Sequence, residues 1–193
     1  MTAARRTVSF AASELIDADG VKTSFATSTS PVTLVPTDLD GVLCAGGNGF
    51  IARLPRVVTI TRSNSANQFS VSPITLTYRR GGVLLTSSIT PANDDGNDTL
   101  AFAPAVDQIV SIALPAGGGT GGTYTVGVRD LCAPAGDTFT AAHLHADGNL
   151  VVAYDPAGTV TDTVPSLADA VKPVAAQRIL TSAMSVGVTV YLP

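Results

Sequence analysis

The amino-acid sequence predicts an all-β protein, an antiparallel β-sandwich with an irregular N-terminal arm and glycine-rich loops. Stretches in which apolar and polar residues alternate recur along the chain. Turn residues separate them at the short, regular spacing typical of sandwiches and barrels. Strands do not alternate with long helices, which excludes a parallel α/β sheet. A jelly roll is a form of the sandwich that fits the same pattern, and it stays open at this point.

The segment from Val106 to Leu131 shows the alternation most clearly. It reads as a strand, the glycine-rich loop Pro115–Gly122, and a second strand. Apolar residues at every second position share one face of each strand, as expected for strands buried on one side. These residues are Val110, Ile112 and Leu114 before the loop, and Tyr124, Val126 and Val128 after it.

The N-terminal part, residues 1–49, is less regular and is expected to form an arm with short strands. The expected elements are short strands at Thr7–Phe10 and Val32–Val35, a helical turn within Ala11–Asp19, an extended stretch at Val21–Thr29 and a loop at Thr37–Gly49. Few residues here show a clear core pattern. Ordering such a segment costs backbone entropy, so we expect it to lie against a neighbouring subunit. The sandwich, residues 50–193, is expected to fold without Met1–Pro36.

Residues 50–193 contain the regular strands. Hairpin turns are predicted at Gly81-Gly82 and Asp147-Gly148. A short capped helix is predicted at Ser166–Val171. The strands outside the central pair are expected at Arg56–Arg62, Ile74–Arg79, Val83–Ile89, Thr99–Phe102, Thr138–His145, Leu150–Tyr154, Ala176–Ser182 and Val186–Leu192.

The composition is low in charge. Charged residues make up 13% of the 193 residues and hydrophobic residues 45%, with a net charge of −4; about 25% charged is usual for a globular domain. Two explanations remain open. Threonine-rich outer faces would need little charge, and so would a surface that partners cover.

Several partners and compartments are disfavoured by the same composition. The chain has no basic run of the kind that binds nucleic acid. No window approaches the roughly 18 apolar residues of a membrane span. The apolar stretch after Arg5-Arg6 is too short for a secretion signal, so we expect an unexported chain made in the cytoplasm. Cys44 and Cys132 are therefore expected to be free thiols, and a disulfide between them is the alternative under oxidising conditions.

His143 and His145 are the only two histidines, and as residues i and i+2 of a strand they point to one face. With Asp147 nearby they are candidate metal ligands, but zinc sites use three or four protein ligands. We therefore predict no metal ligands here and interpret the pair as partly exposed hairpin residues.

Two loops have compositions that suggest ligands. Asp94–Asp98 carries oxygens of the kind calcium prefers but lacks the spacing of an EF-hand, so a plain turn is favoured and calcium binding stays open. Gly117–Gly122 suggests phosphate binding, but no Lys-Ser or Lys-Thr and no helix follow it. A flexible or partner-contacting tip is the alternative. The chain also lacks a G-x-S-x-G elbow and has one glutamate, Glu14. We predict no catalytic residues, no cofactor and no enzyme activity.

Two stretches between Ser72 and Cys132 resemble a known class of proteins: SPITLTYRRGGVLLTSSITPANDDGNDTL and QIVSIALPAGGGTGGTYTVGVRDLC. With their threonine-rich strands and glycine loops, they resemble virion structural proteins of tailed bacteriophages, such as capsid decoration or cement proteins. The resemblance implies no functional residues. It implies a homo-oligomeric structural protein on the outside of the capsid, with the major capsid protein and other copies of itself as partners. Such a protein would bridge neighbouring capsomers.

Two other functions remain as alternatives. The first is a ligand- or receptor-binding module of a phage tail. The second and weaker one is a metal-dependent β-sandwich enzyme that uses His143 and His145. A cupin-like site would need a third histidine, which the chain does not have.

Overall fold

The computed structural model describes residues 6–44, 47–64, 68–166, 171–182, 184 and 186–193. The chain is 59% strand and 3% helix, and its strand pairs are antiparallel in every described register. The predicted all-β antiparallel sandwich is confirmed. The described residues contain fourteen strands, whereas a jelly roll has eight.

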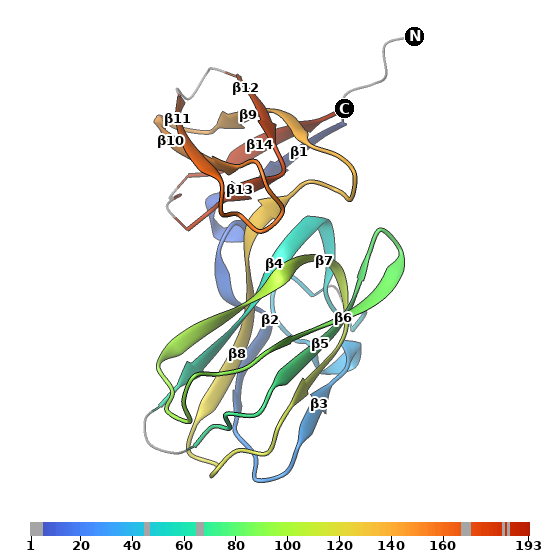
Figure 1. Ribbon diagram of the computed structural model, residues 1–193, viewed down its shortest axis with the longest axis vertical. Coiled ribbons are helices and arrows are strands. Elements are labelled where there is room, and N and C mark those ends of the chain that lie inside the picture. The colour runs from blue at the N-terminus through green and yellow to red at the C-terminus, as the bar shows by residue number, and fades with distance from the viewer. Residues whose placement is uncertain (1–5, 45–46, 65–67, 167–170, 183, 185) are drawn as a thin grey trace. The chain divides into compact units, whose positions relative to one another are not determined.

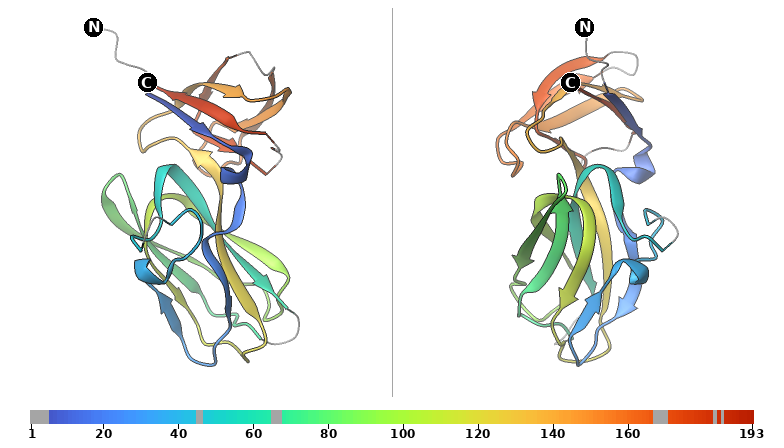
Figure 2. Two further views of the ribbon diagram at one scale, coloured as in Figure 1. Left: turned by 180° about the vertical axis from the view of Figure 1, so that it is seen from behind. Right: turned by 90° about the vertical axis from the view of Figure 1, so that its right-hand side faces the viewer.

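The chain folds into two compact units (Figures 1 and 2). Unit 1 consists of Met1–Asp17, Arg53–Arg56 and Arg129–Pro193, and unit 2 of Ala18–Ala52 and Val57–Val128. This division differs from the predicted boundary at residue 49. The first segment, which ends at Asp17, belongs with the end of the chain, and residues 18–52 belong with the middle.

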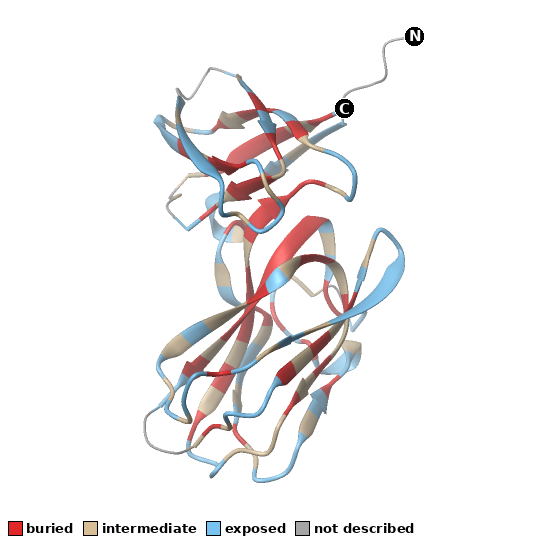
Figure 3. Cartoon of the chain, in the orientation of Figure 1, coloured by how far each residue is buried: buried red, intermediate tan, exposed pale blue. Residues whose placement is uncertain are grey.

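Unit 1 is a small sandwich with its own core. One sheet has the order β1 (Arg6–Phe10), β14 (Val188–Leu192), β9 (Phe139–Leu144) and β12 (Lys172–Ala176). The opposite layer has the order β11 (Thr161–Ser166), β10 (Gly148–Ala153) and β13 (Arg178–Leu180), and β13 pairs with the end of β8 (Thr123–Cys132). The apolar side chains of the two layers pack together, among them Phe139, Leu144, Leu150, Val152, Ile179 and Val190. Figure 3 shows buried segments in both layers of this unit.

Unit 2 is built from longer strands. Its main order is β8, β4 (Ile51–Ser63), β7 (Asp98–Leu114), β5 (Ile74–Arg80) and β6 (Val83–Ile89). β2 (Asp17–Ala26) pairs with β8, and β3 (Val32–Leu34) pairs with β7. The strands enclose one core, which contains most of the residues that the alternation placed inside: Val58, Ile60, Ile74, Leu76, Tyr78, Ile112, Leu114, Tyr124, Val126 and Val128.

The N-terminal segment was expected to be poor in core residues, and this expectation is wrong. Phe10 and Leu15 are buried in the core of unit 1, and Val21, Leu34 and Leu39 in that of unit 2. The segment also supplies β1, β2, β3 and two short 3₁₀ turns, Ala12–Glu14 and Pro36–Asp38. Its apolar residues are separated by glycine, threonine and charge, which hides their burial from a periodicity search.

Three local expectations also need correction. Val110 is not on the core face, because the register of β5 against β7 shifts between Thr77 and Tyr78 and brings Ile109 inward instead. β7 runs unbroken through Pro104, where the sequence suggested a break. Ser166 ends strand β11, which the sequence did not predict, and residues 167–170 of the predicted helix lie outside the described residues.

Candidate functional site

The histidine pair lies on the outer side of the β1-β14-β9-β12 sheet. The ring centroids of His143 and His145 are 6.0 Å apart at an interplanar angle of 62°. The Nε2 atom of His145 lies 2.9 Å from the Thr189 hydroxyl, which in turn lies 2.7 Å from the Ser9 hydroxyl. His145, Thr189 and Ser9 therefore form a hydrogen-bonded row that crosses neighbouring strands of the sheet. Within the described residues, no three His, Cys, Asp or Glu side chains are grouped so that they could hold a metal ion.

Asp98, the last residue of the acidic loop, and Asn93, just before the loop, bind the side chain of Arg62. Nε and Nη2 of Arg62 each donate to a carboxylate oxygen of Asp98 at 2.7 Å, and Nη1 donates to the Asn93 carbonyl at 2.9 Å. The Arg62 side chain is 1% exposed. A guanidinium thus takes the bidentate position on Asp98 that a cation would occupy, which favours the plain-turn interpretation.

The glycine-rich loop is bound to the rest of unit 2. The N–H of Gly121 donates to Gln68 Oε1 at 2.8 Å, and the N–H of Gly117 donates to the Ser28 carbonyl at 2.7 Å. A Cβ added at Gly117 or Gly119 would lie 2.4 Å from an oxygen of Gln68. At Gly117 the oxygen belongs to the Gln68 backbone, so glycine is needed there for close packing, whereas at Gly119 it belongs to the Gln68 side chain, which can move. The N–H groups of Gly117, Gly121 and Gly122 are engaged within the chain. These contacts tie the loop to unit 2 and argue against a flexible tip, and a partner-contacting tip stays a prediction.

Neither Cys44 nor Cys132 forms a disulfide. The Cys44 thiol donates to the Val21 carbonyl at 3.2 Å, and burial raises the pKa of Cys44 to about 11. Cys132 is buried. The raised pKa leaves Cys44 as a protonated structural thiol at neutral pH and makes it a poor nucleophile.

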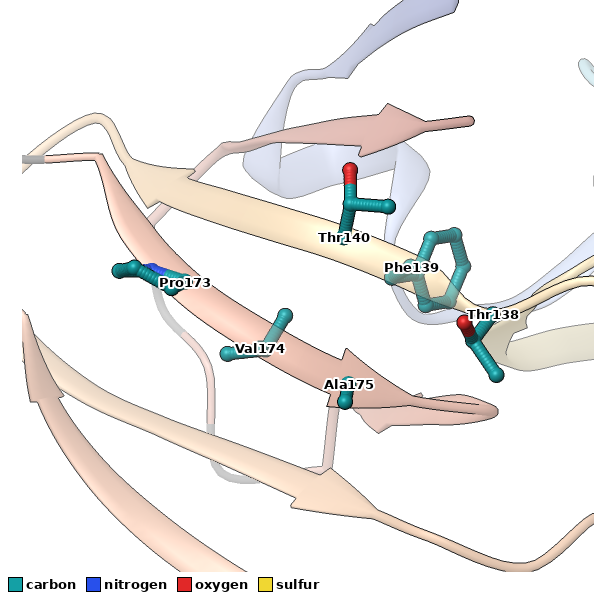
Figure 4. A pocket seen from close by; sticks show the side chains of 6 residues that line it. All are labelled: Thr138, Phe139, Thr140, Pro173, Val174 and Ala175. Carbon is teal, nitrogen blue, oxygen red and sulfur yellow. The ribbon is translucent and has the colours of Figure 1, made fainter.

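Among the open hollows on the surface of the described residues, one lies in each unit. In unit 1 a hollow of about 450 Å³ lies where β12 shifts register against β9 between Pro173 and Ala176. Figure 4 shows Phe139 and Val174 at this place. In unit 2 a hollow of about 560 Å³ is lined by Phe25, Lys22 and Asp40 among others. The Lys22 ammonium donates to Asp40 at 2.5 Å, so its two charged groups already satisfy each other.

Strand β6 exposes apolar side chains at the end of its sheet. Val83, Leu84 and Leu85 are 59%, 54% and 39% exposed. β6 pairs with β5 along its whole length and is the last strand in the order of its sheet. Figure 3 shows the β5–β6 hairpin as an exposed part of unit 2.

The hairpin between β10 and β11 exposes a second apolar pair, in unit 1. Tyr154 and Val160 are 43% and 58% exposed, and the Tyr154 N–H donates to the Val160 carbonyl at 3.0 Å. The Asp155 carboxylate accepts from the Val160 N–H at 2.6 Å and from the Thr159 N–H at 2.9 Å. The tip is therefore held in one conformation by its own hydrogen bonds.

Comparisons with protein-family models, with curated proteins and with solved structures found no match to the chain. Of the described residues, no helical segment has the length and hydropathy to cross a membrane.

Histidines, acidic residues and glycines were the candidate site residues that the sequence suggested. The structure brings His143 and His145 together and engages Asp98 and the glycine loop in internal contacts. The exposed groups on β6 and at the β10–β11 tip were missed, although three consecutive apolar residues in a hairpin strand are a signal in the sequence.

Proposed function

We propose that this chain is a structural virion protein of the decoration or cement type, which binds the outside of a phage capsid and bridges neighbouring capsomers. The observation that carries the proposal is that each of the two units presents its own exposed apolar surface. Val83–Leu85 on β6 forms the one in unit 2, and Tyr154 with Val160 forms the one in unit 1. A bridging protein needs at least two contact surfaces.

These small apolar surfaces are expected to make contacts that are weak one by one but are repeated many times. Full burial of one Val or Leu side chain contributes roughly 1.5–3 kcal/mol, and these residues are already partly covered. A few such side chains cannot hold a lone protein on a shell. Repeated over a lattice with two attachment points for each chain, the same contacts give strong retention through multivalency. The low charge of the chain, 13% of residues, agrees with a surface that partners cover.

The copy number of the chain in purified particles tests the proposal. A cement protein should be present in tens to hundreds of copies, and particles that lack it should lose their integrity at a lower temperature and recover when the pure chain is added. A few copies for each particle would support the tail-module alternative instead. Absence of the chain from particles would remove both.

Substitutions at the β10–β11 tip test whether this surface contacts the particle. Tyr154→Ser and Val160→Ser should each reduce retention on the particle without changing the fold, because both side chains are exposed. Val71→Ser is the matched control, since Val71 is 54% exposed but lies outside both surfaces. Equal loss of retention in the control would mean that the β10–β11 tip is not a contact surface.

The tail-module alternative rests on a different observation, the unit 2 hollow at Lys22, Phe25 and Asp40. Its lining combines the Phe25 ring with polar groups, as ligand pockets do, although a ligand would have to compete with the Lys22–Asp40 ion pair. Binding of a carbohydrate or receptor fragment that Phe25→Ala abolishes would favour this alternative.

A further inference from the structure

Four strands end the strand orders of the described sheets, and β2 and β3 each pair with one strand only; β6 differs from these other five. β2 carries Asp17, Asp19 and Lys22, and β3 has only three residues. β1 carries Arg6, β11 carries Asp162 and Pro165, and β12 carries Lys172, Pro173 and a register shift. Charges, prolines and bulges at sheet edges prevent pairing with other chains. The β6 sequence, VLLTSSI, has neither charge nor proline, and its seven residues pair with β5 without a shift. β6 is thus the end strand best suited to accept another strand.

The core face of unit 2 continues onto β6 without being covered there. On β5, Ile74 and Tyr78 face the core and are buried. Their cross-strand partners on β6 are Ile89 and Leu85, and cross-strand partners share a face. Leu85 is nevertheless 39% exposed, and Val83 on the same face is 59% exposed. The apolar core face of the sheet therefore continues from β5 onto β6, where other residues of unit 2 do not fully cover it.

We propose that β6 pairs antiparallel with β6 of a second copy of this chain, about a two-fold axis at Thr86. In this register Thr86 lies opposite its own equivalent, Leu85 opposite Ser87, and Val83 opposite Ile89. All residues on the core face stay on one side, so the apolar faces of the two sheets join. A two-fold contact needs a self-complementary surface, which this register provides.

The charges at the two ends of β6 favour a second copy in this orientation. The hairpin that begins β6 follows Arg79 and Arg80 and binds one carboxylate, Asp107, so it keeps a net positive charge; the loop after β6 contains Asp94 and Asp95. Antiparallel pairing brings the basic end of one copy beside the acidic end of the other. A parallel arrangement would bring like charges together. The opposite signs at the two ends of the same strand give complementarity between identical chains.

If β6 pairs with a second copy, attachment to the shell falls to the Tyr154–Val160 surface of each copy, and the dimer keeps two attachment points. This inference therefore names the occupant of the β6 surface and can be tested with no shell present. Analytical ultracentrifugation of the purified chain over a wide concentration range tests it. We expect a reversible monomer–dimer equilibrium. A chain that stays monomeric throughout, while still attaching to particles, would overturn the pairing and leave the proposed function standing.

Charge variants at Thr86 test the register. Thr86 is exposed, so Thr86→Lys and Thr86→Glu should fold normally, as checked by circular dichroism and thermal unfolding. Each variant places like charges directly opposite each other and should lose the dimer, and an equimolar mixture of the two should form it again. Thr163→Lys, at an exposed threonine of end strand β11, is the matched control and should dimerise like the unmodified chain. Dimers in both single variants, or none in the mixture, would overturn the proposed axis.

Discussion

Arg178 and Asp130 form a buried ion pair in unit 1, in which Nε and Nη2 of the arginine donate to the same carboxylate oxygen, Oδ2, at 3.1 and 2.5 Å. Both side chains are at most 5% exposed. The other oxygen, Oδ1, accepts from the Thr181 N–H at 3.0 Å, and the Thr181 hydroxyl donates to the Leu15 carbonyl at 3.1 Å. The pair thus links the end of the chain to its N-terminal segment.

Asp130→Ala should lower the free energy of unfolding by about 3–5 kcal/mol, because it leaves the Arg178 guanidinium buried without its counter-charge. Urea denaturation measures the change. Combining Asp130→Ala with Arg178→Met should cost less than the sum of the two single variants, since the double variant leaves neither member of this pair buried without the other. Additive losses would contradict the coupling.

Leu15→Ala should destabilise the protein by about 2–5 kcal/mol, because Leu15 is fully buried in the core of unit 1. Ile16→Ala is the neighbouring control, at a residue that is 44% exposed, and should have a much smaller effect. Deletion of residues 1–36 should prevent folding, contrary to what the sequence alone suggested. A truncated chain that unfolds cooperatively like the full one would restore the detachable arm.

Cys44 should react slowly with a thiol reagent at neutral pH in the native protein. Burial raises its pKa to about 11, so about one molecule in 10⁴ carries the thiolate at pH 7. The reaction rate should rise about tenfold per pH unit until that pKa is approached. Measurement in Cys132→Ser isolates this thiol. A labelling rate that is high at pH 7 and does not change with pH would contradict the predicted protection.

Acid should remove a stabilising contribution of Asp40. The hydrogen bond from Lys22, followed by that from the Thr23 N–H, lowers the pKa of Asp40 from 3.8 to about 2. A carboxyl group whose pKa is lowered in the folded state stabilises the folded protein at pH values above its unfolded-state pKa. This stabilisation is lost as the pH falls through the folded-state pKa, so the loss occurs between about pH 4 and pH 2. Thermal unfolding of Asp40→Asn should therefore depend less on pH in this window. If the unfolding temperature depended on pH in the same way in Asp40→Asn and in the unmodified protein, the Asp40 carboxylate would contribute nothing to stability.

The sequence predicted those parts of the fold in which alternation is local and unbroken. The buried faces of β5 and of β8 as far as Val128 follow from every second residue being apolar. Val110 was misplaced because a register shift between two strands depends on the partner strand. The burial of Leu15 depends on contacts with residues far along the chain, and no local period reveals it.

The candidate surfaces were harder to predict than the fold. The fit of Gly117 against Gln68 is a non-local contact, so the loop looked free in the sequence. β6 looked like an ordinary hairpin strand, because the sequence does not show which strand ends a sheet. Only the succession Val83-Leu84-Leu85, which breaks the alternation, indicated an exposed apolar surface.

Hydrogen exchange of the β6 amides tests the central claim, that the free edge of β6 is a contact surface, most directly. In an antiparallel strand, alternate residues direct their N–H groups to each side, so part of the amides in Val83–Ile89 point away from β5. These amides should exchange rapidly in dilute protein and become protected when the chain is concentrated, with no such change in the end strand β11. Exchange in Val83–Ile89 that stays the same in dilute and concentrated protein would contradict the account.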